Sequence, residues 1–161
     1  MAAAGAAAFM LASAGPALAE SPYDFASGGG QTALGETFGF SGHGGPNGPS
    51  GYVTYQTATF DIAGAVTCLN AAAGRLATIG IVIERSSDPA LIGQGFLLYV
   101  EDGDAVNATR PDRVTYALVD RPATRRCTAR RVTPFQTVVN GNVVVEDSAD
   151  ADPVEEPAST T

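Results

Sequence analysis

The chain contains no lysine. Its nine basic residues are all arginines, and 17 aspartates and glutamates give a formal net charge of −8 at pH 7. Nucleic acids and anionic membranes select proteins with a broad positive surface, so neither is expected as the main partner. An acidic balance instead favours solubility, in keeping with a protein that works outside the cell.

Cysteine and histidine are scarce, with two residues of the first kind and one of the second. Cys68 and Cys127 lack the C-x-x-C spacing of a redox pair, and too few further ligands are available for a zinc site. His43 lies in a glycine-rich loop without a catalytic pattern, and Ser41 is not part of a G-x-S-x-G elbow. We therefore expect no cofactor and no catalytic residue.

Long apolar runs are missing after the N-terminus, so no membrane span is expected in the rest of the chain. Residues 1–19 carry no charge and end in Ala17-Leu18-Ala19, the small-x-small pattern of a signal peptidase site. The run is rich in alanine and glycine, which makes it a poor membrane anchor. It predicts a signal peptide cleaved after Ala19 and hence a secreted protein. The positive charge usual before such a run is absent, which we attribute to a start further upstream.

An exported chain with two cysteines most simply forms one disulfide, here between Cys68 and Cys127. The bridge would close a loop of about 60 residues, worth roughly 4 kcal/mol by its effect on the entropy of the unfolded chain.

Helical periodicity is absent after the signal peptide, whereas period-2 and β-branched runs are frequent. The central element is a predicted hairpin of residues 62–69 and 76–84. A second hairpin is predicted from residues 132–139 and 143–146, because Asn140-Gly141 suits a type I′ turn. Further strands are expected at residues 33–41, 51–60, 93–101 and 113–119. About 7–9 strands predict an all-β protein, an antiparallel β-sandwich or a small β-barrel.

The chain is expected to contain a single folded domain. Residues 1–19 would be the signal peptide, 20–30 a flexible leader, 31–147 the β-domain and 148–161 a disordered acidic tail.

Five of the nine arginines fall within eleven residues, which is uneven for an acidic chain. They are Arg121, Arg125, Arg126, Arg130 and Arg131. Arginine binds phosphate and carboxylate groups in a bidentate manner. The cluster is therefore a candidate anion-binding site, with a charged strand face balanced by the acidic tail as the simpler alternative.

An acidic turn follows the strand predicted at residues 93–101. Asp102 and Asp104 are weak candidates for calcium ligands, with Glu101 and Asp112 beside them. Their spacing does not complete an EF-hand loop, so a solvated turn is the simpler interpretation and no metal site is predicted.

A recurrent pattern links the segment Gly64–Leu69, with its VTCL sequence, to GRLATIG at residues 74–80 and VEDG at residues 100–103. With the glycine-rich start at residues 27–30 and Phe38-Gly39-Phe40, it resembles small secreted β-domains of actinobacteria. Some similar modules sit on larger surface proteins. The resemblance implies secretion and a β-fold, and it assigns no catalytic residue.

Our first hypothesis is a secreted binding or surface-interaction module without catalytic activity, for a cell-wall polyanion, a glycan or a surface protein. The alternative is a small-ligand carrier or a cyclase-like barrel enzyme, which needs an apolar cavity. A purely structural domain is the third hypothesis. A filled interior, with Phe38, Phe40, Ile81, Phe96 and Leu98 packed together, would favour the binding module.

Overall fold

The computed structural model describes residues 23–105, 107, 109–130, 132 and 134–148. The predicted signal peptide and nearly all of the predicted acidic tail lie outside this range. The strands are β1 (Phe25–Thr32), β2 (Thr37–His43), β3 (Ser50–Gln56), β4 (Asp61–Ala72), β5 (Leu76–Val82), β6 (Arg85–Ser86), β7 (Gly95–Glu101), β8 (Arg113–Val119) and β9 (Gln136–Glu146). Two short 3₁₀ helices, η1 (Pro89–Leu91) and η2 (Arg121–Arg125), complete the described elements.

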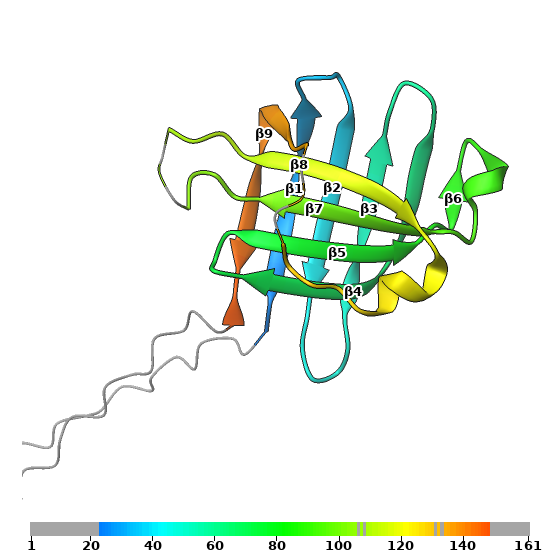
Figure 1. Cartoon of the computed structure of the whole chain (residues 1–161), viewed down its shortest axis with the longest axis horizontal. Helices are drawn as coiled ribbons and strands as arrows, with labels where there is room; N and C mark the ends of the chain where they lie inside the picture. The colour runs from blue at the N-terminus through cyan, green and yellow to red at the C-terminus, as the bar shows by residue number, and fades with distance from the viewer. Residues whose placement is uncertain (1–22, 106, 108, 131, 133, 149–161) are drawn as a thin grey trace, which may run out of the picture.

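Eight of these strands form a closed antiparallel barrel, which confirms the all-β prediction. The order is β3-β2-β1-β9-β8-β7-β5-β4, and pairing between β3 and β4 closes it, while β6 adds to the edge of β4. Figure 1 shows the barrel as two layers, with β4, β5, β7 and β8 running across β9, β1, β2 and β3. Within the described residues no helix is long and apolar enough to cross a membrane.

Strand β4 connects the two layers because it changes partner along its length. Residues 61–65 pair with β3, and residues 66–72 pair with β5 after a register shift between Val66 and Cys68. The hairpin of β4 and β5 confirms the predicted central element. Its turn has positive φ at both Ala73 (54°) and Gly74 (56°), as a type I′ turn requires.

The inside of the barrel is packed with apolar side chains that alternate with outward-facing ones along each strand. Ile79, Ile81, Phe96 and Leu98 are fully buried there. The same buried cluster includes Ala26, Phe38, Phe40, Val53, Tyr55, Ile62, Val100, Val114, Val143 and Val145. Phe38, Phe40, Ile81, Phe96 and Leu98 therefore pack in one core, the arrangement expected for a binding module rather than a carrier.

Two predictions about local structure are wrong. The flexible leader predicted for residues 20–30 ends earlier, because residues 25–30 belong to β1 between β2 and β9. The second hairpin does not form, because β9 continues through Asn140-Gly141.

Glycines explain both differences. A Cβ on Gly30 would lie 2.0 Å from the carbonyl oxygen of Asn140, and one on Gly28 would lie 2.6 Å from that of Asn142. The small residues that suggested a loose leader instead let the backbone of β9 approach β1 closely. Gly141, with φ of 113°, allows β9 to curve along β1 without turning back.

Candidate functional site

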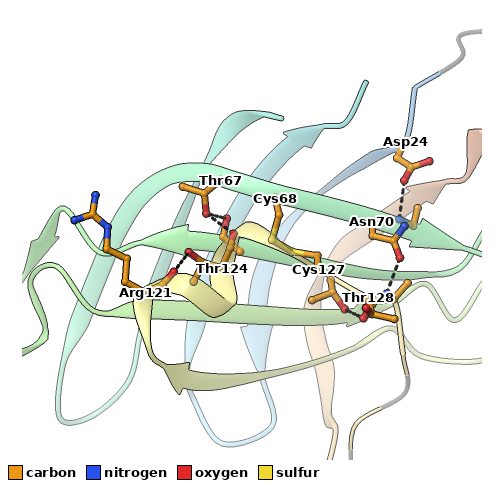
Figure 2. Close-up of a disulfide and its surroundings, with 12 residues drawn as sticks. Asp24, Thr67, Cys68, Asn70, Arg121, Thr124, Cys127 and Thr128 are labelled. Carbon is orange, nitrogen blue, oxygen red and sulfur yellow. Dashed lines mark hydrogen bonds between the residues drawn. A yellow bond between two sulfur atoms is a disulfide. The ribbon is translucent and has the colours of Figure 1, made fainter. Parts of the chain in front are cut away.

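The chain between β8 and β9 crosses the outer face of the layer that contains β4, β5 and β7. We call residues 120–130 the strap. Figure 2 shows how side chains of β4 and β5 hold it. The Thr67 hydroxyl donates to the carbonyl of Thr124 (2.7 Å), and the Thr78 hydroxyl donates to the carbonyl of Thr128 (2.9 Å). The strap is thus bound to the sheet without being a strand of it.

Two further links fix the strap. Cys68 and Cys127 form the predicted disulfide, with a Cα–Cα distance of 5.7 Å. The amide of Ala129 donates to Oδ1 of Asn70 over 2.7 Å. The strap can approach β5 closely because residue 80 is a glycine, where a Cβ would lie 2.6 Å from the sulfur of Cys68. The strap is therefore attached near both its middle and its end.

The arginine cluster lies on the strap, and the structure divides it. Arg126 and Arg130 line a hollow of about 480 Å³ together with Tyr99 of β7. Arg121 lines a different hollow beside Leu118, and Arg125 lines neither of the two. Arg131 lies outside the described residues. The simpler alternative of a charged strand face is wrong, because Arg121 and Arg125 belong to η2.

Arg130 is held in place by Tyr99, a residue the sequence reasoning missed. Its Nη2 donates to the tyrosine hydroxyl over 3.2 Å, and its Cζ lies 5.6 Å from the ring centroid. Tyr99 itself is only 2% exposed. The signal in the sequence was a tyrosine in the apolar run of β7, since a buried hydroxyl needs a polar partner.

The guanidinium groups of the strap are available for an external anion. Arg121, Arg125, Arg126 and Arg130 are exposed, and within the described part of the chain none of them forms an ion pair with a carboxylate. Arg130, which the ring of Tyr99 orients, lines the same hollow as Arg126, and two such guanidinium groups can together bind a phosphate or a carboxylate.

The acidic turn has a structural role. Carboxylate oxygens of Asp102, Asp104 and Asp112 lie within 4.8 Å of one another. Asp102 accepts the backbone N–H groups of Ala105 and Val145, at 3.0 and 3.2 Å. Asp112 likewise accepts those of Gly103 and Val143, at 2.9 and 2.7 Å. The two buried carboxylates therefore join the loop between β7 and β8 to β9.

Burial is the main cause that raises the pKa of Asp102 to about 6, and a hydrogen bond with Asp104 adds to it. A calcium ion would have to compete with the backbone N–H groups that already donate to Asp102. Glu101 is fully buried, with its Oε1 2.7 Å from Nη2 of Arg110. An oxygen in this ion pair is not free to bind a cation.

Aromatic rings from β3, β7 and β8 pack against one another. Tyr116 stacks on Phe96 at a centroid distance of 5.4 Å and contacts Tyr55 at 4.9 Å. The Tyr55 hydroxyl donates to Oε2 of Glu36 over 2.6 Å. Burial, followed by Glu36, raises the pKa of both Tyr55 and Tyr116, so neither is suited to lose a proton at neutral pH.

His43 and Ser41, for which no catalytic pattern was found in the sequence, lie on the outside of the barrel. His43 ends β2 and its ring contacts Phe25 at a centroid distance of 4.9 Å, while Ser41 is exposed on the same strand. Comparison with family models, with curated proteins and with solved structures finds no match to this chain.

Proposed function

We propose that this protein is a secreted, non-catalytic binding module that holds an anionic polymer on its strap. The ligand class is a cell-wall polyanion or an acidic glycan. The observation that carries the proposal is the pairing of Arg126 with the ring-oriented Arg130 in one hollow, on a chain with a net charge of −8. Two exposed arginines that line one hollow on an acidic protein attract anions to it.

The attachment of the strap supports a site that is ready before binding. Less conformational entropy is lost when the donors are already ordered, and this increases affinity. The disulfide also suits an oxidising compartment, as expected for a secreted protein.

The filled interior supports the binding module over the carrier or cyclase-like enzyme. A carrier needs a cavity large enough to enclose its ligand. Here the central positions of β5 and β7 are occupied by Ile79, Ile81, Phe96 and Leu98. The ligand would therefore bind to the outer surface.

Co-sedimentation with purified actinobacterial cell walls, at low and high salt, tests the proposal. The test variant is Arg126→Ala/Arg130→Ala, and the control is Arg121→Ala/Arg125→Ala, which removes the same charge outside the hollow. Charged hydrogen bonds contribute about 1.5–3 kcal/mol each, so the test variant should bind at least about tenfold more weakly.

The control should lose much less affinity, and binding should weaken with salt. Equal losses in both variants would show a diffuse charge effect and no site. Absence of sedimentation at low salt would contradict the proposal. Where the protein does sediment, soluble polyphosphate and hyaluronate used as competitors separate phosphate from carboxylate recognition.

A further inference from the structure

A further hollow lies on the opposite layer, where β1 and β9 meet the loop after β2. It has a volume of about 450 Å³ and we call it the His43 pocket. Its side-chain lining is Tyr23, Phe25, His43, Asn47, Ser50 and Glu146, with glycines of the loop between β2 and β3. This volume lies within the range of about 300–1,000 Å³ that is usual for small-molecule sites.

Cross-strand register builds the base of the pocket. Phe25 pairs with His43 on one side and with Glu146 on the other, and His43 pairs with Ser50. Directly paired residues point to the same face of a sheet, here the outer one. Two rings and two polar groups therefore form one row across four strands.

The sides of the pocket come from Tyr23 and the loop. A Cβ on Gly45 would lie 1.9 Å from the ring of Tyr23, so the glycine lets the ring pack directly on the loop backbone. Asp24 anchors this arrangement. Its carbonyl accepts the amide of Gly44 (2.7 Å), and its Oδ2 accepts the amide of Ala71 in β4 (3.0 Å). The pocket is thus tied to both layers of the barrel.

The charge of the His43 pocket differs from that of the strap. Among the described residues its lining includes the carboxylate of Glu146 and no arginine, so it does not suit an anion. Aromatic faces attract C–H groups, while Asn47, Ser50 and Glu146 can exchange hydrogen bonds with hydroxyls. A sugar ring presents apolar C–H faces and equatorial hydroxyls together.

The neighbouring outer face argues for a chain of sugars. The next row across β9, β1, β2 and β3 holds Val144, Ser27, Ser41 and Tyr52. The row after it holds Asn142, Gly29, Gly39 and Thr54. Both rows consist of uncharged side chains, several of them small. An extended neutral ligand could lie over them without leaving a charge unpaired.

We propose that the His43 pocket binds one ring of a neutral glycan, with the chain continuing over the outer face of β1 and β2. This site is independent of the anion site on the strap. Either can exist without the other, and together they would let the module hold two different polymers.

Amide NMR of the ¹⁵N-labelled protein tests the proposal, using maltohexaose, cellohexaose and chitohexaose as probes. At least one probe should shift the signals of Tyr23, Ser50 and the loop glycines. Phe25→Ala should weaken binding about tenfold, the effect of losing one aromatic contact. Glu146→Gln keeps the shape but removes the charge of the acceptor, so it should also weaken binding.

Two further variants sharpen the test. Gly45→Ala should displace Tyr23 and reduce binding without removing any side chain of the pocket. Arg126→Ala/Arg130→Ala should bind the sugar unchanged, so that failure here and failure of the anion site are distinguishable.

No shift with any of the three sugars would overturn the proposal. A response to tetramethylammonium with none to sugars would also overturn it, in favour of a cation site. Shifts that depend on protein concentration and not on added sugar would overturn it as well, in favour of a contact between two copies of the chain.

Discussion

Reduction of the disulfide should destabilise the protein more than any other single change to the strap. Cys68 and Cys127 are 59 residues apart, and the chain-entropy relation for a loop of this size gives about 4 kcal/mol at 25 °C. The native state loses little on reduction, because hydrogen bonds to Thr124, Thr128 and Ala129 still hold the strap. Most of the effect should therefore come from the unfolded chain.

Equilibrium unfolding in guanidinium chloride, followed by circular dichroism, measures this effect. The oxidised protein is compared with the protein kept reduced, which retains both sulfur atoms and their volume. The double variant Cys68→Ala/Cys127→Ala should lose somewhat more, since Cys68 is buried and alanine leaves a small void.

A loss below about 1 kcal/mol on reduction would refute this reasoning, because the loop-closure term would then be absent. A large loss accompanied by release of the strap, seen as faster amide exchange at Ala129, would assign the effect to the native state instead.

Two further predictions concern the barrel and the acidic turn. Gly30→Ala should cost at least about 2 kcal/mol, since its Cβ would overlap the backbone of β9, and thermal unfolding would show it; an unchanged melting temperature would contradict the close approach. The raised pKa of Asp102, about 6, means that the folded state keeps a proton that the unfolded state releases near pH 4. Its contribution to stability is therefore full below pH 4 and is lost as the pH rises to about 6. Asp104→Ala removes both the hydrogen bond and the negative charge that help to raise the pKa of Asp102, so this pKa should fall and less stability should be lost between pH 4 and 6. If an NMR titration of the Asp102 carboxyl finds the same pKa in both proteins, Asp104 is not a cause of the raised value.

The period-2 pattern and the two cysteines were sufficient for the central part of the fold. Strand β8 occupies residues 113–119 as predicted, the arms of the β4–β5 hairpin end within three residues of their predicted bounds, and Cys68 pairs with Cys127. The strand and the hairpin depend on residues close together in the chain, and two cysteines can form only one disulfide. The sequence therefore carries enough information to predict all three features.

Only the tertiary structure decided how β1 and β9 pair and which arginines act together. Asn140-Gly141 has a strong local preference for a hairpin, but the glycines of β1, more than a hundred residues earlier in the chain, offer a closer partner. Arg126 and Arg130 line one hollow together with Tyr99 of β7, and Arg121 lines another, although all three belong to one cluster in the sequence. These contacts join residues that are far apart along the chain, so they cannot be predicted from patterns within a short stretch of sequence.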